Sequence, residues 1–133
     1  MKNAIVLCSG GLDSVVTAQY IKKKLKYGNL IILFFNYNQR TFKQERKFAL
    51  ICTKELDAKF REIKLEWLGK ISSSLINKRG KVNRIKRRDL KDTRKESRSW
   101  YVPNRNAVFL SYAVALAESL FLMENEIYDI FDI

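Results

Sequence analysis

The chain has 133 residues, of which 47% are hydrophobic, a length and composition typical of one globular domain with a substantial core. It carries 26 lysines and arginines against 14 acidic residues, and the resulting charge of +12 favours an anionic partner such as a nucleotide or nucleic acid. Two cysteines and no histidine argue against a disulfide scaffold, a structural zinc site and histidine-based acid–base catalysis.

No segment of the chain is predicted to enter or cross a membrane. The sequence Met-Lys-Asn is followed by only five apolar residues, which is too short for a signal peptide. No apolar run reaches the length that a membrane-spanning helix requires. We therefore expect a soluble, cytoplasmic protein with no membrane partner.

Predicted strands and helices alternate along the first half of the chain. Residues 4–8 form a continuous apolar run, which indicates a strand buried on both faces. A second such run covers residues 29–35, and residues 59–65 alternate like a third strand. Strands in this order, separated by helices, predict a parallel α/β sheet whose ligands bind at the carboxyl ends of the strands.

Two helices are expected between these strands. The first ends at Gly28, and its apolar positions recur at helical spacing at Val15, Val16, Ala18, Ile21 and Leu25. The second runs from about residue 41 to residue 57. Its expected inner face consists of Phe42, Phe48, Ile51, Cys52 and Leu56.

The second half of the chain is less regular. Residues 77–98 are rich in lysine and arginine and almost free of apolar residues, so we expect a basic, mobile surface loop. An anionic partner and a merely solvated surface explain this run about equally well. Residues 106–122 are apolar on nearly every face and predict a buried helix, and residues 126–133 have the composition of one more strand.

The segment Ser-Gly-Gly-Leu-Asp-Ser at residues 9–14 lies between the first predicted strand and the first predicted helix. Gly10 and Gly11 lack the Cβ atoms that would hold a phosphate away from the backbone N–H groups. The positive end of the helix dipole and the hydroxyls of the two serines favour an anion further. Asp13 is interpreted as a helix cap or as a ligand of a magnesium ion that bridges phosphates.

This segment differs from a Walker A loop, because its Gly-Lys-Ser/Thr end is missing and no lysine reaches a γ-phosphate. It suits a site that holds a departing pyrophosphate while another group attacks the α-phosphate. For two glycines alone, an ordinary strand-to-helix turn would be the simpler explanation. The full string of six residues directly after a buried strand favours phosphate binding.

Two further polar segments are expected near this loop. Residues 37–40, Tyr-Asn-Gln-Arg, follow the second strand; Arg40 has a forked donor geometry for phosphate or carboxylate, and Gln39 suits a base edge or a carboxylate. Residues 101–106 lead into the apolar helix, whose N-terminus with Arg105 and Asn106 is a natural anion site. Taken alone, each segment is better explained as a polar loop or a helix start.

Together these segments resemble a known family. The string at residues 9–14 identifies the ATP-pyrophosphatase (PP-loop) superfamily, whose fold is a Rossmann-like, adenine nucleotide alpha hydrolase-like parallel sheet. Four segments then look like the 7-cyano-7-deazaguanine synthase family of queuosine and archaeosine biosynthesis, namely residues 37–40, 72–75, 101–106 and 109–111. The resemblance makes residues 1–133 the N-terminal part of a single ATP-pyrophosphatase domain.

The resemblance implies an ATP-dependent ligase that converts 7-carboxy-7-deazaguanine and ammonia into 7-cyano-7-deazaguanine. In that reaction the substrate carboxylate attacks the α-phosphate and pyrophosphate leaves. Ammonia then displaces AMP to give an amide, and a second activation converts the amide into the nitrile. ATP with Mg²⁺ is the implied cofactor, and the protein would act by spreading the charge of the transition state.

The implied site residues fall into three sets. Those that bind ATP are Cys8, Ser9, Gly10, Gly11, Leu12, Asp13, Ser14, Val15, Val16, Thr17 and Ala18. Those that bind the substrate are Tyr37, Gln39, Arg40, Arg105 and Asn106. Those with catalytic roles are Asp13, Ser14, Arg40 and Arg105. No protein metal site is implied, because the four cysteines of the family's Zn²⁺ site have no counterparts here.

The chain departs from the family at two positions and in length. Asn38 and Asn104 stand where such families usually have glycine, and asparagine tolerates left-handed backbone, so we expect both turns to be retained. The family continues well beyond the length of this chain, with further strands. We therefore expect one sheet edge and much of the helix after Asn106 to be poorly covered, and turnover to be impaired.

Two other functions are left open. A PP-loop tRNA-modifying enzyme, of the lysidine or thiouridine synthase type, would use residues 77–98 to bind tRNA phosphates, but no interleaved aromatic residues favour base stacking there. A non-catalytic remnant would bind ATP without releasing pyrophosphate. The sequence also leaves open whether a homodimer forms.

Overall fold

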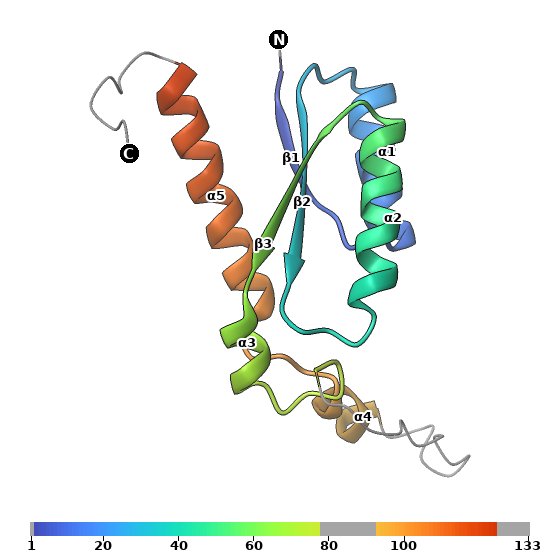
Figure 1. Ribbon diagram of the computed structural model, residues 1–133, viewed down its shortest axis with the longest axis vertical. Coiled ribbons are helices and arrows are strands. Elements are labelled where there is room, and N and C mark those ends of the chain that lie inside the picture. Colours follow the sequence, from blue (N-terminus) through green and yellow to red (C-terminus); the bar gives the residue numbers. More distant parts are fainter. Residues whose placement is uncertain (1, 78–92, 125–133) are drawn as a thin grey trace.

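The computed structural model describes residues 2–77 and 93–124, and these form a parallel sheet with helices on both faces (Figure 1). The strands β1 (Ala4–Leu7), β2 (Leu30–Asn36) and β3 (Lys59–Lys64) lie in the order β1-β2-β3. Leu7 is opposite Leu33, and Asn36 is opposite Lys64. The predicted α/β class and parallel sheet are confirmed, and the arrangement is consistent with a Rossmann-like domain.

The helices form two layers around this sheet. Helix α1 (Leu12–Gln19), continued by the π-helical turn η1 (Tyr20–Lys24), and helix α2 (Phe42–Glu55) lie together on one side, and α5 (Arg105–Glu124) lies on the other (Figure 1). The first helical segment ends before Gly28, which corrects the sequence prediction. The left-handed residue after this segment is Lys26, with φ of 54°.

The middle strand, β2, contributes side chains to two hydrophobic cores. The core against α1 and α2 consists of Val6, Cys8, Ala18, Leu30, Ile32, Phe34, Ala49, Cys52 and Leu56. The core against α3 (Glu66–Ile71) and α5 consists of Leu33, Phe35, Tyr37, Leu65, Leu68, Val102 and Leu116. Successive β2 side chains point to opposite faces, so burial on both faces explains why its sequence is apolar without alternation.

The inner face of α2 differs from the one predicted. Phe48 and Ile51 are 52% and 43% exposed, so their assignment to the inner face was wrong. The helix turns Ala49 and Thr53 inward instead. The physical reason is helical periodicity: Ala49, Cys52, Thr53 and Leu56 lie on one face of the helix and are buried, whereas Phe48 and Ile51 flank that face.

The basic segment 77–98, predicted to be a mobile loop, is helical at its C-terminal end, and its mobility stays a prediction. Residues 93–99 form helix α4 (Thr93–Ser99). The backbone N–H of Leu75 donates to the carbonyl of Ser99 at 2.7 Å, and Asn77 Nδ2 donates to the carbonyl of Tyr37 at 2.6 Å. Residues 78–92, and the predicted strand at 126–133, lie outside the described residues.

Helix α5 is far more exposed than its composition predicts. Among its 20 residues only Leu116 is buried, so the prediction of a buried helix was wrong. Its inner side packs on the sheet, where the ring of Phe109 stacks on Phe35 with centroids 4.1 Å apart. The expected poor cover of this helix is confirmed, because the described sheet covers only one side of it.

By length and composition alone, α5 is also apolar enough to cross a membrane, with a mean hydropathy of 1.6. This differs from the expectation that no segment reaches that length. Core helices of soluble proteins pass the same test, but they are mostly buried, whereas only 6% of the apolar window of α5 is buried among the described residues.

Cys52 allows a test of the first core. Burial raises the pKa of its thiol from 9.0 to about 11, with smaller contributions from Cys8 and Glu55. The thiol therefore ionises more readily in the unfolded chain, so its contribution to stability is complete below pH 9 and is lost as the pH rises through 11. Between pH 9 and pH 11 we therefore expect the free energy of unfolding of Cys52→Ala to fall by roughly 2 kcal/mol less than that of the unchanged protein. Urea unfolding of both proteins measures this, and equal declines would contradict it.

Candidate functional site

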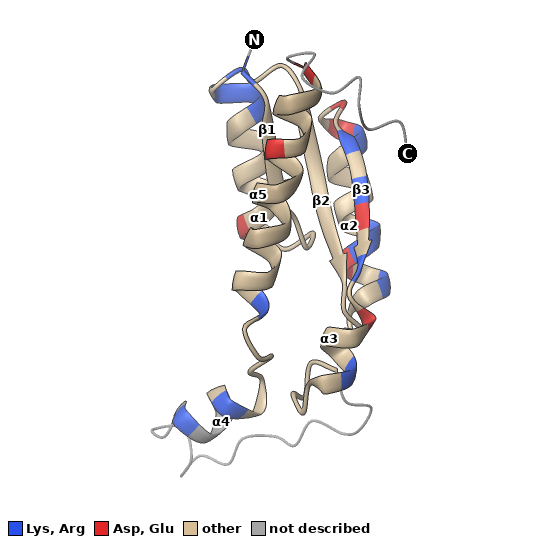
Figure 2. Ribbon diagram, turned by 90° about the vertical axis from the view of Figure 1, so that its left-hand side faces the viewer, with Lys and Arg blue, Asp and Glu red and all other residues tan. Residues whose placement is uncertain are grey.

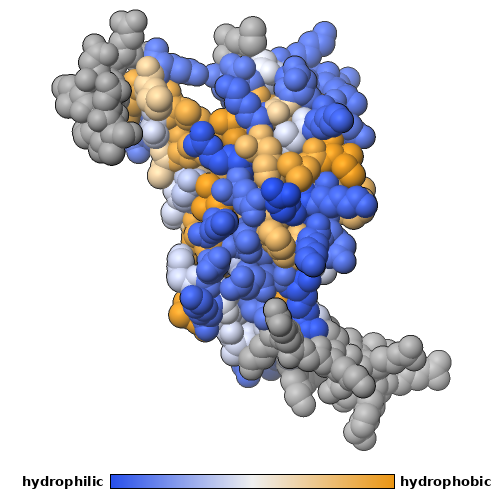
Figure 3. Space-filling view, viewed as in Figure 1, coloured by the Kyte–Doolittle hydropathy of each residue, from blue (hydrophilic) through white to orange (hydrophobic). Residues whose placement is uncertain are grey.

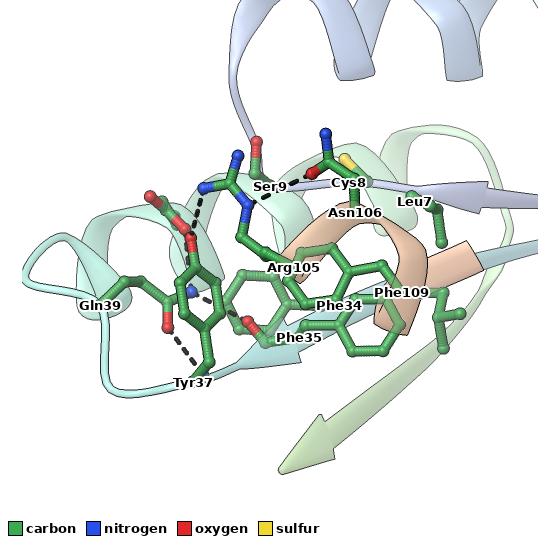
Figure 4. Close-up of a pocket in the computed structure, with 12 residues that line it drawn as sticks. Leu7, Cys8, Ser9, Phe34, Phe35, Tyr37, Gln39, Arg105, Asn106 and Phe109 are labelled. Atoms are coloured by element: carbon green, nitrogen blue, oxygen red, sulfur yellow. Dashed lines mark hydrogen bonds between the residues drawn. The ribbon is translucent and has the colours of Figure 1, made fainter. Parts of the chain in front are cut away.

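A pocket of about 330 Å³ opens at the carboxyl ends of β1 and β2 (Figure 4). Three segments that are distant in sequence form most of its wall: the end of β1, the end of β2 with the loop after it, and the first turns of α5. The residues that line it are Leu7, Cys8, Ser9, Leu33, Phe34, Phe35, Tyr37, Gln39, Glu45, Arg105, Asn106 and Phe109. The structure thus brings together the three segments that the sequence analysis singled out.

Arg105 and Tyr37 form one side of this pocket. Arg105 Nη1 donates to the Tyr37 hydroxyl at 3.3 Å, and the guanidinium carbon lies 5.9 Å from the centre of the Tyr37 ring. Arg105 Nε donates to Asn106 Oδ1 at 3.3 Å, so the guanidinium is held between Tyr37 and Asn106 (Figure 4). The pocket therefore contains a positioned cation at the N-terminus of a long helix, an arrangement that attracts anions.

Burial raises the pKa of Tyr37, whereas the charge and hydrogen bond of Arg105 oppose this rise and the charge of Glu45 adds to it. The hydroxyl is therefore protonated at neutral pH. It accepts the hydrogen bond from Arg105 and keeps its own proton available to a ligand.

Gln39 holds the loop after β2 in place. Its Oε1 accepts from the backbone N–H of Tyr37 at 2.9 Å, and its Nε2 donates to the carbonyl of Phe35 at 2.9 Å and to Glu45 Oε2 at 3.0 Å. Both donors of the buried amide are used within the protein. In this structure Gln39 positions Tyr37. The predicted contact of Gln39 with a base or carboxylate could use only the second lone pair of Oε1.

Glu45 lines the pocket from α2, and the sequence analysis missed it. Its carboxylate accepts hydrogen bonds from Gln39 and from the hydroxyl of Thr41. The sequence signal was weak: an acid in the first turn of a helix is common because it suits the helix dipole. Only the fold shows that Glu45 and Arg105 contribute opposite charges to one pocket.

The two glycines of the loop after β1 have different roles. Gly10 has φ of 76°, and a Cβ there would lie 2.7 Å from both the carbonyl oxygen of Glu45 and the Cβ of Phe48. Gly11 has an ordinary φ of −73°, and the nearest atom to its Cβ would be Ser9 Oγ at 3.4 Å. Packing against α2 therefore explains Gly10, whereas no contact among the described residues requires glycine at 11. The space beside Gly11 remains open to a ligand.

The first turn of α1 follows this loop. Ser14 Oγ donates to the carbonyl of Gly11 at 3.0 Å. The interpretation of Asp13 as a helix cap was wrong. In the described part of the chain no side chain caps the start of α1 with a hydrogen bond, and the Asp13 carboxylate is exposed. Ala18 is completely buried in the core, so its part in the site is structural. Thr17 Oγ1 donates to the carbonyl of Asp13 at 2.7 Å, within the same helix.

Among the remaining residues assigned to ATP binding, only Cys8 and Ser9 line the pocket. Leu12 and Val16 are exposed, and Val15 is partly buried against the core.

Arg40 is not brought to the pocket. Its backbone N–H donates to the carbonyl of Ile76, and its Nε donates to the carbonyl of Leu75. Arg40 thereby ties the loop after β2 to the segment after α3. Its assignment to substrate binding and catalysis stays a prediction, and the geometry gives it a positioning role.

Two asparagines and one glycine shape the turns around the site. Asn38 and Asn104 have φ of 60° and 51°, which confirms that asparagine takes the left-handed backbone at both positions. Gly69 of α3 was missed by the sequence analysis, although a Cβ there would lie within van der Waals overlap of the Tyr37 carbonyl oxygen. Because Gly69 has no side chain, α3 packs directly against the loop that carries Tyr37.

A second hollow, of about 380 Å³, shares Arg105 and Asn106 with the first. Its other lining residues are Ser97, Trp100, Tyr101, Val102, Asn104 and Ala107. Arg105 therefore lies between two cavities that both open at the N-terminus of α5.

Comparison with known protein families identifies the chain. Residues 3–127 match the family described as "Queuosine biosynthesis protein QueC". The chain belongs to this family. The match includes all three segments of the pocket, and it confirms the resemblance drawn from the sequence.

Several proteins named "7-cyano-7-deazaguanine synthase" are similar to the chain. The one from Pyrococcus furiosus is 36% identical over 126 residues, which cover 90% of this chain and 51% of the relative. The one from Methanosphaera stadtmanae is 37% identical (88% and 52%), and the one from Campylobacter hominis is 40% identical (86% and 50%). The chain spans about half the length of these relatives.

The different roles of the two glycines give a stability prediction. We expect Gly10→Ala to destabilise the fold by about 2 kcal/mol or more, because it combines a left-handed backbone with overlap against α2. Gly11→Ala should change stability by less than about 0.5 kcal/mol, because its backbone is ordinary and its surroundings are open. Thermal and urea unfolding of the two variants measure the difference. Similar losses in both would contradict the assignment of Gly10 to helix packing.

Proposed function

We propose that this chain forms the nucleotide and substrate pocket of an ATP-dependent ligase that converts 7-carboxy-7-deazaguanine and ammonia into 7-cyano-7-deazaguanine. One observation carries this proposal: in a member of the QueC family, the loop after β1, the loop after β2 and the N-terminus of α5 share one pocket. The name of the similar proteins supports the product. The geometry supports the way in which ATP would be held.

The phosphates of ATP are proposed to bind between the loop after β1 and Arg105. The open side of Gly11 gives a ligand access to the backbone N–H groups at the start of α1. Two helix N-termini, those of α1 and α5, lie at this end of the sheet and favour negative charge. Arg105 would counter the charge that develops on the α-phosphate, and the α1 turn would hold the departing pyrophosphate.

The planar base of the substrate is proposed to lie against the aromatic floor of the pocket. Phe109 stacks on Phe35 and meets Tyr37 edge-on, with centroids 5.5 Å apart. A deazaguanine ring would gain stacking contacts there. Glu45 retains acceptor capacity beyond its bonds to Gln39 and Thr41, which suits the N–H groups on the edge of a guanine-like base.

Magnesium is proposed to accompany ATP, and Asp13 fits that role. Its exposed carboxylate lies in the first turn of α1, and Mg²⁺ in such sites uses one or two carboxylates together with phosphates. When bound, the ion would offset phosphate charge. The family's zinc site does not fit this chain, because its two cysteines are buried in the core, and the described residues hold no cluster of three or more His, Cys, Asp or Glu.

The alternatives can be distinguished in solution. Salt-dependent binding of tRNA would favour a tRNA-modifying enzyme of the lysidine or thiouridine synthase type. Tight ATP binding without pyrophosphate release, in the presence of 7-carboxy-7-deazaguanine and ammonia, would favour a non-catalytic remnant. Membership of the QueC family favours the deazaguanine reaction over both.

Arg105 provides a binding test. We expect Arg105→Ala to weaken Mg²⁺–ATP binding by about 10- to 100-fold, because it removes charge-assisted hydrogen bonds to phosphate. Arg61→Ala is the matched control, since Arg61 is an exposed arginine on β3, away from the pocket lining. Isothermal titration calorimetry measures both. An equal effect of the two substitutions would show that only net charge matters.

Asp13 and Ser14 provide a test of the reaction. We expect Asp13→Ala and Ser14→Ala to abolish ATP-dependent pyrophosphate release, because the first turn of α1 would no longer hold metal and phosphate together. Released pyrophosphate is measured with 7-carboxy-7-deazaguanine and ammonia present, and circular dichroism checks that the variants fold. Full activity of Asp13→Ala would show that the loop is misassigned.

A further inference from the structure

No step of the proposed reaction uses the second hollow, which lies between the end of α4 and the start of α5. Its volume of about 380 Å³ is within the usual range of small-molecule sites. Trp100 and Tyr101 give its wall two aromatic rings, and Ser97, Asn104 and Asn106 give it polar side chains. Aromatic surface together with a few polar groups is the usual composition of a ligand pocket.

Hydrogen bonds of the connecting turn hold this wall in place. The backbone N–H of Tyr101 donates to the carbonyl of Arg98 at 3.3 Å, and the Tyr101 hydroxyl accepts from the N–H of Asn104 at 3.3 Å. The N–H of Arg105 donates to the carbonyl of Val102, also at 3.3 Å. The aromatic side of the hollow is therefore arranged before a ligand arrives, and a preorganised site loses less conformational entropy on binding.

The hollow also offers donors for an anion. Asn106 and Ala107 lie in the first turn of α5, where backbone N–H groups have no partner within the helix. The hydrogen bonds to Tyr37 and Asn106 use two of the five N–H donors of Arg105, so its guanidinium can donate to a further ligand. Figure 2 shows more basic residues on α4. The surroundings of the hollow therefore favour negative charge.

The walls suit a flat ligand that carries one phosphate. Aromatic rings bind planar heterocycles by stacking, and one guanidinium at one helix N-terminus suits a single phosphate group. None of the described residues that line this hollow is a glycine, so it has no counterpart of the loop after β1 for a longer phosphate chain. Figure 3 shows the larger hydrophobic patches of that face in the upper part of the molecule, away from this end.

We propose that the second hollow binds a nucleoside monophosphate, with its base against Trp100 and Tyr101 and its phosphate at Arg105 and the first turn of α5. AMP is the nucleotide that the proposed reaction releases, and this choice of base is the part of the inference that rests on the proposed function. Because Arg105 borders both cavities, a phosphate in the second hollow takes donors from the first pocket. AMP therefore weakens the binding of Mg²⁺–ATP, and ATP weakens the binding of AMP by the same factor.

The fluorescence of Trp100 tests binding at this site without any reaction. The chain has two tryptophans, and Trp67 is 51% exposed on α3, so Trp67→Phe leaves Trp100 as the single reporter. We expect AMP to quench Trp100 saturably, because a stacked base quenches an indole. Adenosine, which lacks the phosphate, should bind at least about tenfold more weakly. Equal binding of GMP and AMP would support the site and show that it selects stacking and phosphate, whatever the base.

Two matched substitutions on α5 locate the site. Ala107→Leu fills the hollow and should weaken AMP binding about tenfold or more, while Mg²⁺–ATP binding stays within about twofold, because Ala107 does not line the first pocket. Ala117→Leu adds the same side chain at an exposed position of the same helix and should change neither affinity. Leucine is a strong helix former, and circular dichroism verifies that both variants fold. Isothermal titration calorimetry measures the affinities.

Three results would overturn the proposal. The first is the absence of quenching by AMP, or quenching by adenosine at equal concentration. The second is quenching of Trp100 by 7-carboxy-7-deazaguanine but not by AMP, which would assign the hollow to the substrate. The third is a loss of AMP and Mg²⁺–ATP binding together in Ala107→Leu, which would place both nucleotides in the first pocket. None of these results depends on pyrophosphate release, so they are separate from a failure of the proposed reaction.

Discussion

The parallel pairing of β1 with β2 is the constraint on which the site depends. With Leu7 opposite Leu33, both strands run in the same direction, and the loops that follow them emerge at the same edge of the sheet. The packing of Phe109 on Phe35 then holds the start of α5 over that edge. The start of the loop after β1, Tyr37 and Arg105 thereby meet in a single pocket, although Ser9 and Arg105 are almost one hundred residues apart in the sequence.

The second requirement is that the side chains around the pocket hold each other in place. Glu45 and Gln39 are hydrogen-bonded, Gln39 fixes the backbone at Tyr37, and Tyr37 bonds Arg105. This chain of contacts links α2 on one side of the sheet to α5 on the other. A guanidinium that is already oriented loses less freedom when an anion binds, and such preorganisation is the main way in which proteins stabilise phosphoryl transition states.

The sequence predicts the sheet well because both faces of its middle strand are covered. Continuous apolar runs such as residues 30–35 have few alternatives to a buried strand, and the left-handed turns at Asn38 and Asn104 follow from the tolerance of asparagine for that backbone.

The sequence predicts less where the position of a residue depends on another element that packs against it. Periodicity shows that α5 has apolar positions on many sides, but it cannot show which sides are covered. Likewise, the direction of Arg40 is set by carbonyl groups at residues 75 and 76, which no local pattern connects to it. Glu45 and Gly69 were missed for the same reason.

We propose that phosphate binds at the open side of Gly11, between the start of α1 and Arg105. A crystal structure with a non-hydrolysable ATP analogue and Mg²⁺ bound would show where the phosphates lie. We expect a phosphate within hydrogen-bond distance of the Gly11 N–H and of the Arg105 guanidinium, with the base toward Phe109. A nucleotide bound instead in the hollow beside Trp100 and Tyr101, with the space at Gly11 empty, would contradict it.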